Sequence, residues 1–216
     1  MSWVEAIREI SILIGIWVAI VGLDSWRRVH IGKRQLELAE ETLALFYEAV
    51  DALHKMRYPG SFSFETDAIK QLDGETNQQW QARRKASIVF ERYNHYQELF
   101  GKLHAMRYRF MAQIGKEQAK PFDDLQKVVN ELNIAARRLA RRWAKESFPD
   151  EKLWQKHIDE IEKYEAIFWE DEVEPDPINP KLDKIIDTIE KTCSKIIQDQ
   201  GSLAAFFNRP LFRKSG

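Results

Sequence analysis

One long uncharged stretch limits how this chain can fold more than any other feature. It covers residues 10–23, reads ISILIGIWVAIVGL, and has an acidic residue on either side. A helix from Trp3 to Trp26 rises roughly 35 Å at about 1.5 Å per residue, which is enough to cross the ~30 Å hydrocarbon core of a bilayer. Tryptophan at both ends is typical of such a helix, since its amphipathic ring lies at headgroup level. The sequence therefore predicts a membrane anchor over residues 1–28.

The anchor is expected to contact lipid or neighbouring helices through apolar, aromatic and small residues: Trp3, Ile10, Leu13, Gly15, Trp17, Leu23 and Trp26. Two other interpretations stay open. An uncharged run of this length is also typical of a buried helix in a soluble protein, and an apolar helix can lie in the membrane interface or re-enter it. A cleaved signal peptide is not indicated, because its basic residues precede the apolar run, whereas here they follow it.

Basic residues gather on the C-terminal side of the run. Residues 24–34 contain a single acidic residue, Asp24, against Arg27, Arg28, Lys33 and Arg34. An excess of Lys and Arg close to a span marks its cytoplasmic side. We therefore expect a single-pass protein of the cytoplasmic (inner) membrane, with its N-terminus outside and its C-terminal domain in the cytoplasm. The single cysteine, Cys193, agrees with a reducing compartment.

The remainder of the chain has the composition and the periodicity of helices. Only 9 of 216 residues are glycine and 7 are proline, so long stretches lack a helix breaker. Apolar residues recur at alternating steps of three and four in a heptad seam typical of coiled coils: Leu36, Ala39, Leu43, Phe46, Val50 and Leu53. Further apolar stripes predict helices over residues 77–114, from Pro121, from Asp150, and from Pro180 or Lys181.

The predicted fold class is all-α: a single N-terminal transmembrane helix followed by an antiparallel helical bundle with long helices over residues 29–201. Residues 170–180 are acidic and proline-rich, which indicates an exposed linker. Residues 202–216 form an apolar and basic tail. Such a tail can pack on the bundle, rest on the membrane or dock into a partner's groove, and the sequence does not separate these outcomes.

Charge is unevenly distributed, although the formal net charge is only −1. Residues 83–145 are basic and residues 150–176 are acidic. A candidate patch for an anionic partner consists of Arg137, Arg138, Arg141, Arg142 and Lys145. One interpretation is internal, with the acidic helix folded back on the basic one. A surface for anionic lipid headgroups is the second. A nucleic-acid surface is the weakest of the three, because one basic helix lacks interleaved aromatic residues.

The motifs of familiar catalytic and cofactor sites are absent from the sequence. Asp51 and His54 match the carboxylate-x-x-His pattern of di-iron bundles once, which cannot complete a ligand set. No phosphate-binding glycine loop or nucleophile elbow is present. We therefore propose no catalytic, cofactor-binding or metal-binding residue, and no cofactor. Residues 38–49 and 106–115 resemble stretches of bacterial membrane proteins of unknown function, a resemblance that implies no activity.

These patterns favour a membrane-anchored helical interaction or scaffold module of a bacterial multi-protein system, with the lipid bilayer and an unknown protein as its partners. The small residues Ser11, Gly15 and Ala19 let helices approach closely, so the anchor also favours a homo-oligomer. One alternative is a small membrane effector whose spanning helices oligomerise and disturb the bilayer. An unrecognised enzyme on a helical bundle is the other alternative.

Overall fold

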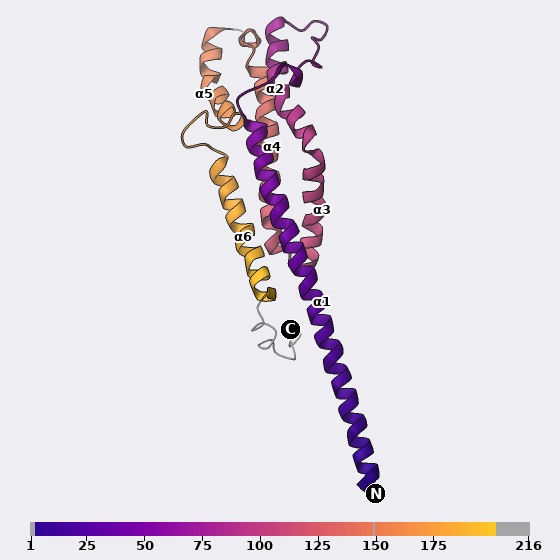
Figure 1. Cartoon of the computed structure of the whole chain (residues 1–216). Helices are drawn as coiled ribbons and strands as arrows, with labels where there is room; N and C mark the ends of the chain where they lie inside the picture. The colour runs from indigo at the N-terminus through magenta and orange to yellow at the C-terminus, as the bar shows by residue number, and fades with distance from the viewer. Residues whose placement is uncertain (1–2, 149, 202–216) are drawn as a thin grey trace. The chain divides into compact units, whose positions relative to one another are not determined.

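The computed structural model describes residues 3–148 and 150–201, and the described part of the chain is helical with no strand (Figure 1). Its elements, in chain order, are α1 (Trp3–Arg57), η1 (Ser63–Glu65), α2 (Asn77–His95), α3 (Gln97–Gln113), η2 (Glu117–Ala119), α4 (Lys120–Arg142), η3 (Lys145–Ser147), α5 (Glu151–Phe168) and α6 (Asn179–Gly201). This arrangement confirms the predicted all-α class and its helical bundle. The predicted tail over residues 202–216 lies outside the described residues.

Helix α1 is one uninterrupted helix that contains the whole uncharged run. Over the part of the chain that the structure describes, no helix holds a stretch both long enough and apolar enough to cross a membrane. The predicted transmembrane helix is therefore not supported there. From residue 11 the uncharged run continues only to Leu23, a rise of roughly 20 Å against a hydrocarbon thickness of about 30 Å. The side chain of Ile10 lies outside the described part.

The chain divides into two compact units. The first consists of residues 1–41 and 193–216, and the second of residues 42–192. In the first unit Cys193 is fully buried, and burial raises the pKa of its thiol to about 12. The thiol therefore stays protonated at neutral pH and acts as a small apolar side chain.

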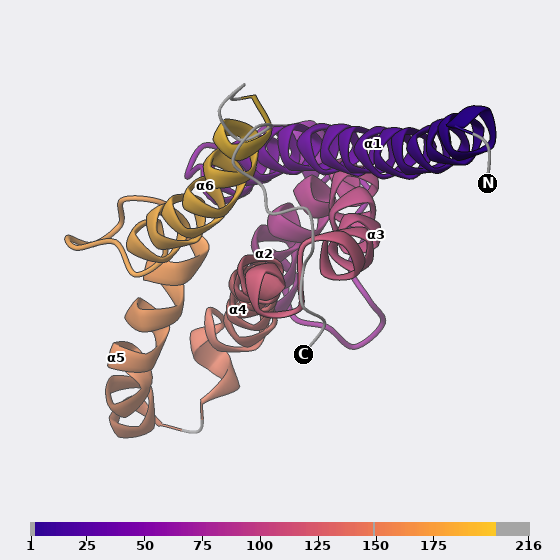
Figure 2. The same cartoon turned by 90° about the horizontal axis from the view of Figure 1, so that it is seen from below.

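One aromatic cluster in the core of the second unit lies where α1, α3 and α4 meet. Phe122 packs edge-on against Phe46 with ring centroids 4.8 Å apart, and lies 5.5 Å from Phe110. Helix α4 also packs against α2 and α5 (Figure 2). Its buried positions recur at helical spacing, as the apolar stripe from Pro121 predicts, and include Leu125, Val128, Leu132, Ala135 and Leu139. Helix α4 therefore serves as the central element of this unit.

Two helical predictions need correction. The helix predicted over residues 77–114 is broken at Tyr96, whose φ of −100° and ψ of 10° end α2 and begin α3. The seam on α1 is rotated, because Leu36, Leu43 and Val50 are only half-buried. The fully packed positions form a wider stripe, which keeps Ala39, Phe46 and Leu53 of the seam and is otherwise displaced by about one residue toward the N-terminus. Its members are Leu38, Ala39, Thr42, Leu45, Phe46, Ala49, Ala52, Leu53 and Met56. A stripe of this width is what a helix buries when several neighbours cover it rather than one coiled-coil partner.

Candidate interaction surfaces

Arg57 is fully buried at the end of α1 and holds the end of α5. Its guanidinium donates hydrogen bonds to the carbonyl oxygens of Ala166, Ile167 and Trp169 at 3.0, 2.9 and 3.0 Å. These carbonyls lie at the C-terminus of α5, where they lack partners within the helix and where the helix dipole favours a cation. Arg57 also pairs with Asp176 at 2.6 Å. The buried charge is therefore neutralised and hydrogen-bonded at once.

Asp176 brings the start of α6 into the same cluster. Its carboxylate accepts hydrogen bonds from the backbone N–H groups of Ile178 and Asn179 at 2.7 and 2.8 Å, which caps the helix. Burial acts to raise the pKa of Asp176, but its hydrogen bonds to Arg57 and to the two amides outweigh burial and hold that pKa below the ordinary value. In the segment predicted as an exposed linker over residues 170–180, residues 171–175 are exposed, whereas the buried carboxylate of Asp176 fixes the end of the segment to the core.

Arg92 on α2 donates hydrogen bonds to carbonyl groups at the end of α1 in a similar way. It donates to the carbonyl oxygens of Lys55, Met56 and Tyr58 at 3.2, 3.2 and 2.6 Å. It also pairs with Glu65 of η1 at 2.6 Å. The hydrogen bond from Arg92 outweighs burial and lowers the pKa of Glu65. Two arginines therefore satisfy the ends of two helices, and neither is free to contact a partner.

The predicted anionic-partner patch on α4 divides into two groups, and the first is used inside the molecule. Arg142 forms an ion pair with Glu160 of α5, and its guanidinium lies 5.7 Å from the centre of the Tyr164 ring. Lys145 pairs with Glu151 at 2.9 Å. For these two basic residues the structure has the internal pairing between a basic and an acidic helix that the sequence suggests.

The second group faces outward. Arg137, Arg138 and Arg141 are exposed, and the structure gives them no ion pair or hydrogen bond with any residue it describes. Arg137 and Arg141 line an open groove of about 580 Å³ between α2 and α4. Arg138 lies on the same helix but does not line the groove. These exposed arginines remain a candidate surface for an anionic partner.

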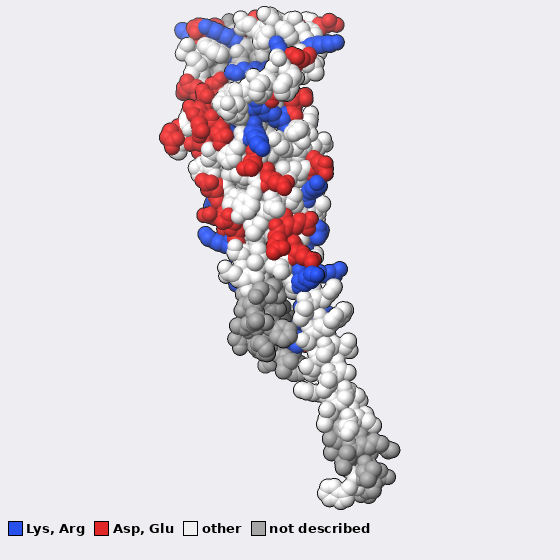
Figure 3. Space-filling view, viewed as in Figure 1, with Lys and Arg blue, Asp and Glu red and all other residues white. Residues whose placement is uncertain are grey.

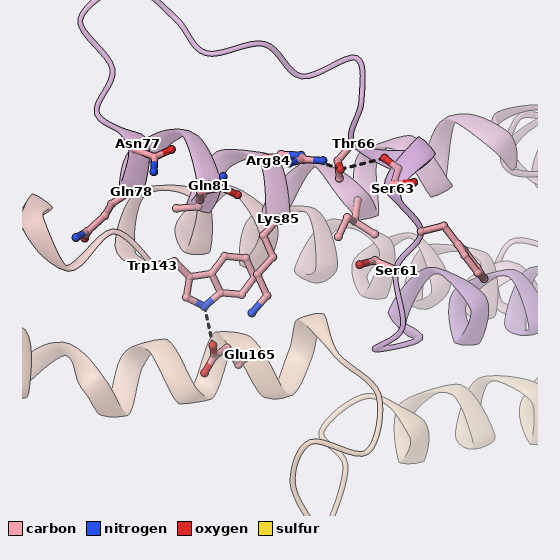
Figure 4. Close-up of a pocket in the computed structure, with 13 residues that line it drawn as sticks. Ser61, Ser63, Thr66, Asn77, Gln78, Gln81, Arg84, Lys85, Trp143 and Glu165 are labelled. Atoms are coloured by element: carbon pink, nitrogen blue, oxygen red, sulfur yellow. Dashed lines mark hydrogen bonds between the residues drawn. The ribbon is translucent and has the colours of Figure 1, made fainter.

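A second and larger pocket, of about 730 Å³, lies between α2, the segment around η1 and the end of α4 (Figure 4). The ammonium group of Lys85 lies 4.2 Å from the centre of the Trp143 ring and 5.8 Å from that of Trp169. Trp143 in turn donates its indole N–H to Glu165 at 2.6 Å. The remaining polar lining carries hydroxyl, amide and guanidinium groups: Ser61, Ser63, Thr66, Asn77, Gln78, Gln81 and Arg84.

The chemistry of this pocket suits non-covalent binding. Its charged groups already have partners, since Lys85 rests on Trp143 and Arg84 donates to the Thr66 hydroxyl at 2.9 Å. Among the described residues, no group of three or more His, Cys, Asp and Glu side chains could hold a metal ion. His54, from the single carboxylate-x-x-His match, contacts Glu170.

Apart from Ile10, whose side chain is not described, the residues predicted to form the anchor are exposed on α1. Every residue from 11 to 20 is exposed, and Leu13 and Trp17 retain 66% and 64% of their accessible surface. Leu23 and Trp26 each retain 68% and Trp3 retains 88%, while Gly15 has no other residue within 4 Å of the position of a Cβ atom. Figure 3 shows the described uncharged stretch of α1, residues 11–23, as a white surface.

The basic flank follows on the same helix. Arg28 pairs with Asp24 one turn earlier at 2.9 Å, and Lys33 lies 3.7 Å from Glu37. Arg27 and Arg34 are exposed. Exposed ion pairs of this kind contribute about 0.5 kcal/mol or less, so the flank keeps its charge available to an anionic surface.

No protein-family model, no curated protein and no solved structure matches this chain. Function is therefore inferred from the surfaces described above.

Proposed function

We propose that this protein is a membrane-tethered helical interaction module, which serves as the scaffold or sensing arm of a bacterial multi-protein system. The observation that carries the proposal is the exposure of apolar side chains on every face of α1 between residues 11 and 20. A helix that is apolar all round requires an apolar environment on all sides. Lipid, or lipid together with a second such helix, supplies that environment.

The free energy involved is large compared with the stability of a domain. Between residues 12 and 26, nine large apolar side chains keep more than half of their surface exposed: Ile12, Leu13, Ile14, Ile16, Trp17, Val18, Ile20, Leu23 and Trp26. Covering the exposed half of each is worth roughly 1 kcal/mol. The segment therefore gains on the order of 10 kcal/mol from entering an apolar phase, similar to the whole stability of many domains.

The ends of the segment support a spanning arrangement in a single direction. Trp3 and Trp26 suit the two headgroup regions, and a hydrophobic stretch shorter than the bilayer is tolerated when the bilayer thins and flanking residues extend to the interface. The basic flank then places residues from Lys33 onward in the cytoplasm. We infer a single-pass protein of the inner membrane with its N-terminus outside.

The polar chemistry of the second unit supports an interaction role over catalysis. Its buried charges, at Arg57 and Asp176, join secondary-structure elements. Its open pockets are lined by groups that bind through charge and hydrogen bonds. Surfaces of this kind are typical of recognition between proteins.

Extraction of membranes with alkaline carbonate tests the tether. The full chain is expected to stay with the membrane pellet, because apolar burial rather than charge holds it. Ile16→Lys should move a larger share into the soluble fraction, since a lysine at the centre of a span costs roughly 3 kcal/mol. Ile134→Lys is the matched control, because Ile134 is 50% exposed on α4 and Ile16 is 52% exposed on α1. A full chain that stays soluble without detergent would overturn the proposal.

A second candidate function is favoured by one observation on the same helix. A Cβ atom built at Gly15 or at Gly22 meets no other residue within 4 Å, so this face is open to a neighbouring helix. Spans that assemble through it could disturb the bilayer as an effector does. Release of a trapped dye from vesicles containing the protein tests this function, and vesicles that stay sealed would exclude it.

A further inference from the structure

Most arginines of the second unit are engaged by other groups, which makes the exceptions informative. Partners within the chain hold seven of them: Arg57, Arg83, Arg84, Arg92, Arg107, Arg109 and Arg142. Arg137, Arg138 and Arg141 have no such partner among the described residues. Three unpaired guanidinium groups within two turns of α4 repel one another, so an anion bound there would relieve the repulsion.

The groove between α2 and α4 gives two of these arginines a shaped environment. Arg137 and Arg141 are one helical turn apart, which places them on the same face of α4 with about 6 Å between their Cβ atoms. Across the groove, Arg83 is oriented by two hydrogen bonds to Glu75 at 2.8 and 2.7 Å. The rest of the lining is apolar at Ala86, Phe90 and Ala140, and polar at Glu75, Gln79 and Ser87. The groove therefore combines an excess of positive charge with an apolar surface.

We propose that this groove binds an acidic, amphipathic helical segment of a partner protein. Glutamates spaced i and i+4 on such a segment match the spacing of Arg137 and Arg141, and a guanidinium can hold each carboxylate through two parallel hydrogen bonds. Aliphatic side chains of the segment fill the space over Phe90, as when an amphipathic helix lies in a groove. The inference rests on the proposed function in one respect, since it names the partner class of the interaction module.

The test measures binding of a fluorescently labelled helical peptide to the full chain in a neutral, mild detergent. The peptide carries glutamates at i and i+4 with leucines on the adjoining face, and its control carries glutamines at the same positions. Arg137→Glu and Arg141→Glu are each expected to weaken binding of the glutamate peptide about tenfold or more. Arg138→Glu is the matched control, because it makes the same charge change at an exposed residue of the same helix outside the groove. It should change affinity by no more than about threefold, through long-range charge alone.

Three results would overturn the proposal. Equal losses for Arg138→Glu and Arg141→Glu would show a diffuse electrostatic surface instead of a groove. Equal binding of the glutamine peptide, or no saturable binding of the glutamate peptide, would remove the acidic segment as the ligand. Binding to vesicles with anionic phospholipid that Arg137→Glu abolishes, without peptide binding, would assign the groove to lipid. None of these measurements depends on carbonate extraction. Failure of the proposed membrane attachment can therefore be distinguished from failure of the proposed binding site in the groove.

Discussion

At the scale of single residues, the most consequential feature is the use of buried arginine to complete helix ends. Arg57 is hidden completely, yet in the sequence it is one of several basic residues at the end of a helix. Cations are favoured at that position in any exposed helix, so nothing in the pattern distinguishes a buried arginine from a solvated one. The distinction depends on Asp176, more than a hundred residues away in the chain.

Replacing Asp176 by asparagine is expected to destabilise the protein strongly. The substitution keeps the shape of the side chain but leaves Arg57 as a buried cation without a countercharge, which costs about 3 kcal/mol or more. The measurement is the free energy of unfolding of the full chain in urea, followed by helical circular dichroism. Asp171→Asn, the same change at an exposed residue of the same segment, should leave stability within about 0.5 kcal/mol. Equal stability of the two variants would contradict the role assigned to the pair.

The protein is also expected to lose stability in acid through its paired carboxylates. The pKa of Asp176 and the pKa of Glu65 are lowered in the folded protein, and the pKa of Glu75 falls to about 2. A lowered folded-state pKa contributes stability above the unfolded-state value of about 4, and that contribution is lost as the pH falls through the folded value. Urea midpoints should therefore be level between about pH 5 and 7 and decline from about pH 4 toward 2. The urea midpoint should decline less steeply with falling pH in Asp176→Asn. Identical slopes in the two proteins would show that Asp176 does not contribute to the acid sensitivity.

At the scale of helices, the sequence predicts those elements whose packing is regular. The stripe on α4 is predicted correctly because the exposed face of this helix is mostly polar and charged, so its buried apolar positions recur at a constant helical period. The break at Tyr96 escapes prediction because no glycine or proline marks it. The rotation of the buried stripe on α1 cannot be predicted for a related reason. Leu43 and Val50 are as apolar as Leu38 and Leu45, so only the placement of the other helices determines which of these side chains is buried.

The candidate surface was open to prediction only in part. The cluster of basic residues on α4 is visible in the sequence, because Arg137 and Arg141 recur at helical spacing opposite the buried stripe. The sequence does not show which of these basic residues remain without an ion pair. That outcome depends on Glu151 and Glu160 of α5, which engage Lys145 and Arg142. Likewise the lining from Arg83 and Phe90 comes from α2, which the sequence alone does not place beside α4.

The anchor is expected to associate with a second copy through its small residues. A bulky side chain at Gly15 meets nothing within its own chain, so Gly15→Ile should leave the fold intact and obstruct only a neighbouring helix. The native mass in mild detergent is expected to correspond to at least a dimer, and to shift toward the monomer in this variant. Leu13→Ile, on the other side of the helix, is the control and should change nothing. A monomeric mass unaffected by Gly15→Ile would remove the idea.

At the scale of the whole molecule, the net charge is −1, but the charged residues fall into groups with different roles. Acidic residues of α5 neutralise part of α4, and buried ion pairs join the ends of helices. Among the residues that the structure describes, exposed arginines without a partner lie in two places. Arg27 and Arg34 follow the uncharged run of α1, and Arg137, Arg138 and Arg141 lie on α4. We propose that the first set orients the protein in a membrane and that the second binds a partner. The two proposed functions are then separable by substitution.

The orientation of the full protein provides the final test of that separation. A reporter that is active only in the cytoplasm, fused after Gly216, is expected to be active, because basic residues within about 15–20 residues of a span set its direction. Replacing Arg27, Arg28 and Arg34 together by glutamine should lower that activity and raise the activity of a periplasmic reporter at the same site. The matched control replaces Arg137, Arg138 and Arg141 by glutamine, an equal change in charge too far from the span to affect insertion. An active periplasmic reporter on the unmodified chain would reverse the proposed topology, and an equal effect of both triple variants would show that total charge rather than the flank sets it.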